Sequence, residues 1–482
     1  MKQCALRPTF LLAVFCATSF LASAQTVKTL AVFDDSNGAW PSAALIQGTD
    51  GNLYGTTQTN VFQMTPSGKV TSIYTVCSVP TCIYSLTAVT ALIQANDNNL
   101  YGTTTYGGTD INAGTLFKIT AGGRYVVLHT FCSGYCTDGA NPNSLVQGVD
   151  GNLYGTTSSD GIGGGGTIFK LTPAGTLTTL YAFCTKASCA DGMRPMGGLL
   201  QSSDGNFYGT TYQGGLFGAG TVFKITPAGT LTTIYDFCAQ LCMDGESPIA
   251  GLVQGNDGDF YGTTYEGGRA GNGTIFKITP DGSFTSVYSF CTQLCTDGLH
   301  PTAALVYGSD GNFYGTTNGD IDFCLGSFNC GTLFQFSPAG VFTRLDTFCS
   351  VRGCGDGFAP FAPLLQDTNG YFYGSSQLGG SFQSSTCEIQ EGCGTTFGLS
   401  MGLAPFVAAS PTFGKSGNYV RILGTNLTGT TSVTFDGTPA LFTVVSKHYI
   451  KAIVPNGASS GFIQVTTPTN TLSSNKAFIV VP

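Results

Sequence analysis

A unit that recurs every 47 to 59 residues dominates this sequence and limits its possible folds more than any other feature. Seven segments share a core such as ALIQGTDGNLYGTT, which begins at Ala44, or GLVQGNDGDFYGTT, which begins at Gly251. The tyrosines of the shared Tyr-Gly step are Tyr54, Tyr101, Tyr154, Tyr208, Tyr261, Tyr314 and Tyr373. A repeat of this period indicates an architecture in which each copy forms one supersecondary unit.

Each copy is predicted to contain four β-strands. Asn256-Asp257-Gly258 and Pro280-Asp281-Gly282 read as tight turns, because Gly and Asn tolerate the positive φ that such hairpins need. The apolar runs around them place the strands of the fifth copy at residues 251–254, 259–264, 273–279 and 284–290. Four antiparallel strands per repeat are typical of a β-propeller blade.

The two ends of the repeat region predict a closed ring. The seventh copy ends at Gly394–Ser400 (GTTFGLS) and lacks a fourth strand, whereas Thr26–Phe33 (TVKTLAVF) resembles an isolated fourth strand. Pairing these segments would complete the seventh blade from both chain ends and remove open sheet edges, which a linear array would leave unsatisfied. We therefore predict an all-β fold, a seven-bladed propeller over residues 25–402 that the N-terminal strand closes.

The repeated motifs also carry a family resemblance. The segments LxQGxDGNxYGTTYxGG and GTxFKITPxGxxTTxYxF resemble the GloVer tandem repeat over roughly residues 26–400. This resemblance implies an exported bacterial protein with a propeller-like fold and implies no particular activity. The DGNxY and KITPxG steps are also similar, more weakly and locally, to the repeats of regulator-type and streptogramin lyase propellers.

Residues 403–482 differ from the repeats, since cysteine disappears and the spacing breaks. The segments at 410–440 and 453–468 resemble an IPT/TIG domain, which implies an immunoglobulin-like β-sandwich. Alternating apolar residues such as Val420, Ile422, Val433 and Phe435 suit half-buried strands. We expect this domain to serve as a spacer or as a second binding module.

The N-terminus is predicted to be a secretory signal. Lys2 and Arg7 precede an apolar stretch, and Ala22-Ser23-Ala24 is a small-residue cleavage site, so we assign residues 1–24 to the signal. No window is long and apolar enough to predict a transmembrane segment. Removing the signal leaves 17 basic against 27 acidic residues, a balance that argues against nucleic acid as a partner.

The cysteines predict disulfides and an oxidising compartment. Sixteen cysteines remain after the signal, and they fall into eight close pairs on an exported chain. Zinc is the weaker alternative, because each pair is isolated and the chain has three histidines. The expected disulfides are Cys77–Cys82, Cys132–Cys136, Cys184–Cys189, Cys238–Cys242, Cys291–Cys295, Cys324–Cys330, Cys349–Cys354 and Cys387–Cys393.

The propeller geometry predicts which surface carries function. The loops between strands two and three and those after strand four lie on one face, which we call the loop face. The short DGN and PxG turns lie on the opposite face, the turn face. All eight cysteine pairs map to the loop face, and loops on a rigid scaffold are the usual carriers of function.

Residues that recur in every blade are expected to be scaffold. The turn aspartates are interpreted as turn chemistry in preference to catalytic or calcium-binding groups; they are Asp50, Asp150, Asp204, Asp257 and Asp310. The recurrent strand-one glutamine is interpreted as buried hydrogen-bonded structure, with a ligand-binding ring as the alternative; its members are Gln47, Gln94, Gln147, Gln201, Gln254 and Gln366.

Candidate ligand-binding residues are therefore those of the loop face that do not repeat. Aromatic rings beside a few polar groups suit stacking on a sugar or gripping a peptide, although the tyrosines could instead pack beneath Gly-rich loops. The candidates are Trp40, Tyr106, Arg194, Tyr212, Tyr265, Glu266, Arg269 and His300, with Asp320 and Asp322 nearby.

These features favour an exported, non-catalytic protein of the bacterial cell surface or periplasm that binds carbohydrate or protein. No cofactor or metal site is predicted. The alternative is a metal-dependent lyase or a polysaccharide-degrading enzyme that uses His300, because His129 replaces a strand-four tyrosine and His448 lies in the C-terminal domain. The sequence leaves open the ligand, the oligomeric state and any attachment to the cell.

Overall fold

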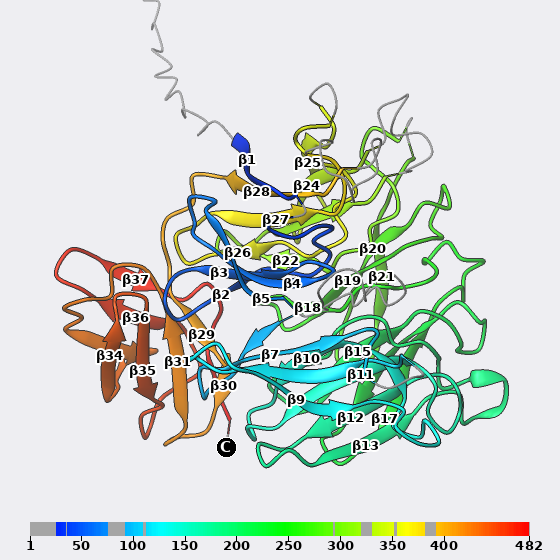
Figure 1. Cartoon of the computed structure of the whole chain (residues 1–482), viewed down its shortest axis with the longest axis horizontal. Coiled ribbons are helices and arrows are strands. Elements are labelled where there is room, and N and C mark those ends of the chain that lie inside the picture. Colours follow the sequence, from blue (N-terminus) through cyan, green and yellow to red (C-terminus); the bar gives the residue numbers. More distant parts are fainter. Residues whose placement is uncertain are drawn as a thin grey trace, which may run out of the picture.

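Seven four-stranded antiparallel sheets and a C-terminal β-sandwich make up the protein (Figure 1). The computed structural model describes residues 26–34, 36–75, 92–108, 112–292, 295–319, 330–350, 354–380 and 392–481. Within these ranges the one helical segment is a 3-10 turn, Ala187–Cys189, and no helix is long and apolar enough to span a membrane. The predicted signal, residues 1–24, lies outside the described residues.

Six blades are continuous in sequence, with their strands hydrogen-bonded in chain order. Blades one to three comprise β2 (Ile46–Gln47), β3 (Leu53–Thr56), β4 (Asn60–Met64), β5 (Val70–Thr75); β6 (Ile93–Gln94), β7 (Leu100–Thr104), β8 (Thr115–Ile119), β9 (Tyr125–Thr130); and β10 (Ala140–Gln147), β11 (Leu153–Ser159), β12 (Thr167–Leu171), β13 (Leu177–Ala182). Blades four to six comprise β14 (Leu200–Gln201), β15 (Phe207–Thr211), β16 (Thr221–Ile225), β17 (Leu231–Asp236); β18 (Val253–Gln254), β19 (Phe260–Thr264), β20 (Thr274–Ile278), β21 (Phe284–Ser289); and β22 (Val306–Tyr307), β23 (Phe313–Thr317), β24 (Thr332–Phe336), β25 (Phe342–Thr347).

The seventh blade joins the two ends of the repeat region, as predicted. Its sheet order is β1 (Thr26–Val32), β28 (Thr395–Ser400), β27 (Phe372–Ser376) and β26 (Leu365–Gln366). β1 runs antiparallel to β28 with Thr26 opposite Ser400 and Val32 opposite Thr395. The pairing of Thr26–Phe33 with Gly394–Ser400 is thereby confirmed, and Phe33 N–H adds a bond to Gly394 O at 2.9 Å. The fold is the predicted closed propeller.

The recurrent Tyr-Gly step packs each blade against the next. Tyr261 is fully buried, and its ring centroid lies 4.1 Å from that of Phe313 in the following blade. The adjacent Gly262 faces Phe276 across β19 and β20, and a Cβ at this glycine would lie 2.4 Å from Phe276 Cζ. The same tyrosine–phenylalanine contact recurs at 4.1–4.2 Å for Tyr154–Phe207, Tyr208–Phe260 and Tyr314–Phe372. Glycine is required at this step because the phenylalanine ring occupies the space of a side chain.

The strand-one glutamine links neighbouring blades on the turn face, which favours its structural interpretation over a ligand-binding ring. Gln147 Oε1 accepts the Asn96 N–H of the preceding blade at 2.9 Å, and its amide nitrogen donates to Gly151 O of its own turn. Equivalent bonds between blades involve Gln47, Gln94, Gln201, Gln254 and Gln366. The sixth blade carries Tyr307 at this position.

The turn aspartates hold their own hairpins. Asp150 accepts the Asn152 N–H at 3.1 Å and the Tyr154 hydroxyl at 2.7 Å. This geometry agrees with turn chemistry. The other turn aspartates bond the Tyr-Gly tyrosine in the same way, and the blade-two turn adds Asp97 to the predicted set.

The C-terminal segment folds as a sandwich of two four-stranded sheets and a short parallel pair. The first sheet is β29 (Ala408–Ser410), β31 (Tyr419–Leu423), β35 (Tyr449–Ile453) and β34 (Phe442–Ser446); the second is β33 (Thr438–Pro439), β32 (Ser432–Phe435), β36 (Ile463–Thr466) and β37 (Thr471–Ser473); β30 (Phe413–Gly414) pairs with β38 (Ile479–Val480). The predicted alternating residues form its core, since Val420, Ile422, Val433 and Phe435 are buried.

The sandwich lies against the turn face of the propeller (Figure 1). Ser446 Oγ donates to Thr49 O at 3.1 Å, and Arg421 Nη1 donates to Ala95 O at 3.1 Å. On the opposite side of the ring, Lys476 Nζ donates to Gln254 O at 3.3 Å and lies 5.7 Å from the centre of the Tyr307 ring. The contacts therefore reach several blades, and the loop face stays on the far side.

Gly51→Ala tests this docking. Gly51 and Gly151 are equivalent turn glycines, both with φ of +81°, so alanine costs each of them about 1–2 kcal/mol of backbone strain. A Cβ at Gly51 would also lie 2.5 Å from the His448 ring, whereas Gly151 has nothing within 4 Å. We expect Gly51→Ala to lower the thermal midpoint in calorimetry clearly more than Gly151→Ala. Equal midpoints for the two variants would contradict the docked arrangement.

Lys476→Met tests the buried amine between the domains. Burial lowers the pKa of Lys476 to about 8, from an ordinary value of 10.5. Between these values the unfolded chain holds more protons than the folded chain, so raising the pH through this window stabilises the wild type. The free energy of unfolding of the wild type should rise by up to about 1.4 kcal/mol per pH unit in this window, and the Lys476→Met variant should lack this rise.

The measurement compares thermal midpoints at pH 7.5 and 9.5, with the exposed Lys451→Met as the control. The advantage of wild type over Lys476→Met should grow with pH, while its difference from Lys451→Met stays constant. A difference in thermal midpoint between the wild type and Lys476→Met that does not change with pH would refute the lowered pKa of Lys476.

Candidate functional site

Disulfide-closed loops follow the outer strands on the loop face. The structure confirms five predicted pairs, Cys132–Cys136, Cys184–Cys189, Cys238–Cys242, Cys291–Cys295 and Cys349–Cys354. Cys330 and Cys393 are also disulfide-bonded, although their predicted partners lie outside the described residues, as do Cys77 and Cys82. These short disulfide-closed loops therefore lie at the outer edge of the loop face.

An aspartate after each of several cysteine pairs holds its loop, and this residue was not among the candidates predicted from the sequence. Tyr235 of β17 donates its hydroxyl to Asp244 at 2.7 Å, and Asp244 also accepts the Ala239 N–H at 3.2 Å. Tyr181–Asp191 and Tyr288–Asp297 repeat this contact. Burial, followed by the bond to Asp191, raises the pKa of Tyr181 to about 12. The Asp-Gly step that recurs after the cysteines was the available signal.

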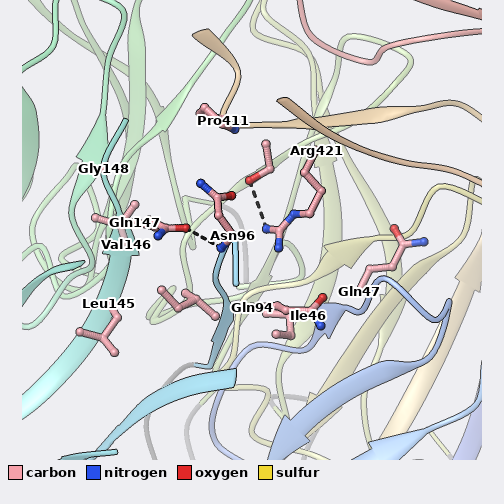
Figure 2. A pocket seen from close by; sticks show the side chains of 12 residues that line it. Ile46, Gln47, Gln94, Asn96, Leu145, Val146, Gln147, Gly148, Pro411 and Arg421 are labelled. Atoms are coloured by element: carbon pink, nitrogen blue, oxygen red, sulfur yellow. Dashed lines mark hydrogen bonds between the residues drawn. The ribbon is translucent and has the colours of Figure 1, made fainter. Parts of the chain in front are cut away.

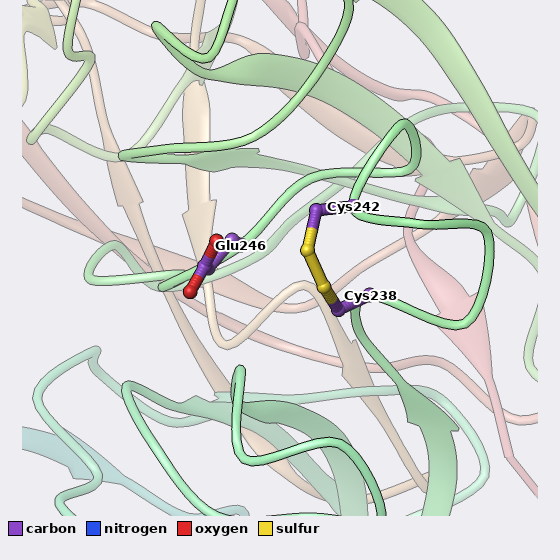
Figure 3. A group of neighbouring side chains, drawn as sticks. All are labelled: Cys238, Cys242 and Glu246. Carbon is purple, nitrogen blue, oxygen red and sulfur yellow. A yellow bond between two sulfur atoms is a disulfide. The ribbon is translucent and has the colours of Figure 1, made fainter.

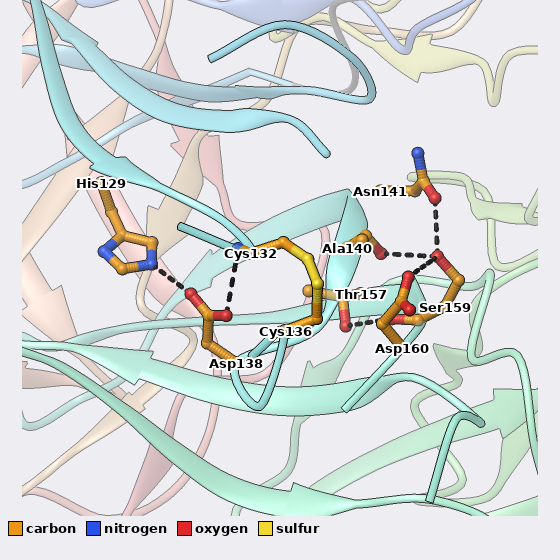
Figure 4. The surroundings of a disulfide bond; sticks show 9 residues. All are labelled: His129, Cys132, Cys136, Asp138, Ala140, Asn141, Thr157, Ser159 and Asp160. Atoms are coloured by element: carbon orange, nitrogen blue, oxygen red, sulfur yellow. Dashed lines mark hydrogen bonds and ion pairs between the residues drawn. A yellow bond between two sulfur atoms is a disulfide. The ribbon is translucent and has the colours of Figure 1, made fainter. Parts of the chain in front are cut away.

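His129 occupies the tyrosine position of this clamp, which supports the prediction that it is structural (Figure 4). Its Nε2 donates to Asp138 at 2.8 Å, and Asp138 also accepts the Cys132 N–H at 3.0 Å. Burial acts to raise the pKa of Asp138, but the bonds from His129 and the Cys132 N–H outweigh it and lower that pKa. The histidine thus replaces the tyrosine as a donor to the same carboxylate.

A ring of pre-proline residues borders the centre of the loop face. Each has a left-handed backbone, with φ between 55° and 59°, and donates its N–H to a carbonyl in the preceding blade's loop before strand three. Arg194 donates to Gly165 O at 2.7 Å, and His300 donates to Asn272 O at 3.0 Å. The ring comprises Trp40, Asn141, Arg194, Ser247, His300 and Ala359. Among these six described residues the backbone is constant while the side chain differs from blade to blade.

The ring surrounds a central cavity of about 460 Å³. The residue after each proline lines this cavity in five blades: Ser42, Asn143, Met196, Ile249 and Thr302. None of the described lining residues is charged. The Ser144 and Thr302 hydroxyl oxygens are buried and have no hydrogen-bond partner in the described part of the chain. The cavity is therefore neutral and weakly polar.

The structure brings four of the eight candidates together as two pairs. The Arg194 guanidinium lies 5.6 Å from the centre of the Tyr212 ring, within cation–π range. The His300 ring stacks on Tyr265 at 4.6 Å, and His300 Nδ1 donates to Tyr265 O at 3.0 Å. Both pairs belong to, or touch, the pre-proline ring.

The other four candidates lie apart from these pairs. Trp40 is half-buried and packs against apolar clusters of blades one and seven, which is the packing alternative for an aromatic candidate. Tyr106 is exposed, and Glu266 pairs through its backbone with Glu246. Arg269 lines a separate outer groove of about 450 Å³. Asp320 and Asp322 lie outside the described residues.

Cys238, Cys242 and Glu246 bring two sulfurs and a carboxylate within 4.8 Å of one another (Figure 3). The two sulfurs are bonded to each other in a disulfide. Metal binding by cysteine needs thiolates, so this group is not a metal site in its oxidised form.

The comparisons with known proteins identify the family. The Gloeobacter/Verrucomicrobia repeat matches residues 59–242 and 185–388, and the chain belongs to this repeat family. An IPT/TIG domain matches residues 406–480. No curated protein sequence matches the chain.

Solved structures share the propeller fold at low identity. A streptogramin B lyase aligns with a TM-score of 0.53 and 16% identity, covering 78% of this chain and 97% of the lyase. A catalytically inactive virginiamycin B lyase from Staphylococcus aureus with quinupristin gives the same TM-score and identity, and the alignment covers 78% of this chain and 99% of the lyase. The extracellular domain of a protein described as a one-component system from B. thetaiotaomicron aligns with a TM-score of 0.52 and 10% identity. The alignment covers 92% of this chain and 47% of that protein chain. These likenesses show the fold alone.

Tyr235→Phe tests the clamp on the disulfide loops. Its hydroxyl donates to Asp244, which is 1% exposed, so the variant leaves a buried carboxylate short of one donor. We expect a loss of about 1–3 kcal/mol in unfolding free energy and faster amide hydrogen exchange at residues 238–244. Tyr212→Phe is the control, because no hydrogen bond to its hydroxyl is present among the described residues. Identical exchange in both variants would count against the clamp.

Proposed function

We propose that this protein is an exported, non-catalytic binding protein of the bacterial cell surface or periplasm, and that its loop face binds a carbohydrate. The observation that carries the proposal is the pre-proline ring, whose six described members present six different side chains on one repeated backbone around the central cavity. The proposed exported chain comprises residues 25–482. Several disulfides fit an oxidising compartment.

The chemistry of the cavity favours a neutral sugar. Its volume of about 460 Å³ is in the range of small-molecule sites, and hydroxyl, amide and small apolar groups line it. Tyr212 and Tyr265 directly follow strand two of their blades and lie beside the pre-proline ring. From there their aromatic side chains can contact a bound saccharide through apolar faces. The sandwich covers the turn face and leaves this surface accessible.

The arrangement of His300 gives little support to the lyase or polysaccharide-degrading alternative. Among the described residues, no hydrogen bond or ion pair joins His300 to Arg194 or to a carboxylate. His300 uses Nδ1 for the Tyr265 carbonyl and its ring face for the Tyr265 ring. We therefore propose that it shapes the binding surface.

A glycan array with residues 25–482 tests the proposal, followed by calorimetry on the best ligand. Tyr212→Ala and Tyr265→Ala should each weaken binding about tenfold, which equals about 1.4 kcal/mol. Tyr371→Ala is the matched control, because Tyr371 is 46% exposed on the opposite, turn face. Absence of any glycan ligand, or equal affinity of all three variants, would overturn the carbohydrate proposal; capture of a protein that depends on Tyr212 would replace it with a protein ligand.

A further inference from the structure

A second cavity lies between the propeller and the C-terminal domain, on the face opposite the proposed carbohydrate site (Figure 2). Its volume is about 250 Å³, far above the roughly 10–15 Å³ that one water molecule needs. Strands β2, β6 and β10 form the propeller side, and Ser410, Pro411 and Arg421 form the other side. Both domains are needed to build it.

Among the described residues that line the cavity, Arg421 is the one charged side chain. Its Nη1 donates to Ala95 O at 3.1 Å and its Nη2 donates to Ser410 Oγ at 3.4 Å, both neutral acceptors. Its Nε atom is buried and has no hydrogen-bond partner in the described part of the chain. A buried donor left without a partner is costly and calls for an acceptor that the protein itself does not supply.

The guanidinium charge also lacks a direct counter-ion. Arg421 forms no ion pair with any described residue. Burial lowers the pKa of Arg421, and the charges of Tyr449 and Asp97 only partly oppose that shift. A buried cation without a paired anion is strongly unfavourable, so an anion inside this cavity would relieve both the charge and the unpaired Nε–H.

Neutral amides complete a set of donors suited to an oxyanion. Gln94 donates one N–H to Asn98 O, and Gln147 donates one to Gly151 O. Each amide nitrogen carries two hydrogens, so each has a second N–H beyond these bonds. The Asn96 side chain lies between Gln147 and Arg421 in Figure 2. Bonds from a guanidinium and amides to a carboxylate are among the stronger hydrogen bonds in proteins.

The apolar residues that line the rest of the cavity indicate which kind of anion would fit. Ile46, Ile93, Leu145, Val146 and Pro411 give the cavity a largely apolar side. One guanidinium balances one negative charge, and a second charge, as on phosphate, would have to be buried unpaired. The walls therefore suit a monocarboxylate with a short apolar chain.

We infer that the cavity between the domains binds a small monocarboxylate, whose carboxylate contacts Arg421 and the glutamine amides while its apolar chain packs on Ile93 and Val146. The ligand would contact both domains and so strengthen their docking. The inference is independent of the proposed carbohydrate site on the loop face.

Isothermal titration of residues 25–482 with sodium butyrate tests the inference, with butyramide as the uncharged isostere. All solutions are matched in ionic strength with sodium chloride. Butyrate should bind saturably at one site per chain, and butyramide should bind at least tenfold more weakly. Equal affinities for the two compounds, or no butyrate binding, would overturn the inference.

Two variants locate the site. Arg421→Gln removes the charge, and Asn96→Phe puts a larger side chain between Gln147 and Arg421 while leaving the Arg421 contacts to Ala95 O and Ser410 in place, so each should weaken butyrate binding at least tenfold. Arg124→Gln, at an exposed residue, is the matched control and should bind as the wild type does. Wild-type affinity in a folded Asn96→Phe protein would refute the assignment, even if Arg421→Gln proved unstable. If a variant lost glycan binding but kept butyrate binding, that result would concern the carbohydrate site on the loop face and would not contradict the monocarboxylate site between the domains.

Discussion

Backbone pairing between the first and last strands of the repeat region is the constraint on which the rest of the structure depends. β1 supplies the fourth strand of a blade whose other strands lie more than 300 residues later. Closure places every blade between two neighbours, so the tyrosine–phenylalanine and glutamine contacts between blades can recur around the ring. An open array would leave such contacts unmade at its ends.

Within the ring, constant and variable positions have separate roles. The Tyr-Gly step, the turn aspartate and the strand-one glutamine make similar contacts in blade after blade, and they hold the scaffold. The pre-proline residues keep one backbone conformation but change from tryptophan to alanine around the ring. Because a hydrogen bond from the N–H of each of these residues to the preceding blade holds that backbone, the side chain can vary without loss of this contact.

The C-terminal domain changes how the two faces can be used. It contacts the turn face through Arg421, Ser446 and Lys476, which donate to backbone carbonyls of different blades. Two of these donors are partly buried cations that lack a carboxylate partner in the described structure, so the interface depends on their hydrogen bonds to backbone carbonyl groups. The docked domain covers one end of the ring and lines a cavity there.

The sequence by itself determined the blades, their closure and the sandwich, because repeat period, strand alternation and turn residues are local signals that act through short-range sterics and hydrogen bonding. Strand bounds in the fifth copy, such as Phe284–Ser289 against the predicted 284–290, agree within two residues. Five disulfides and the structural role of His129 also followed from local spacing. Only the tertiary structure decided that the half-buried Trp40 packs against two apolar clusters, that Tyr265 pairs with His300 across two blades, and that Arg421 lies in a cavity. These facts depend on distances between residues far apart in the chain, and no pattern within a single repeat encodes them.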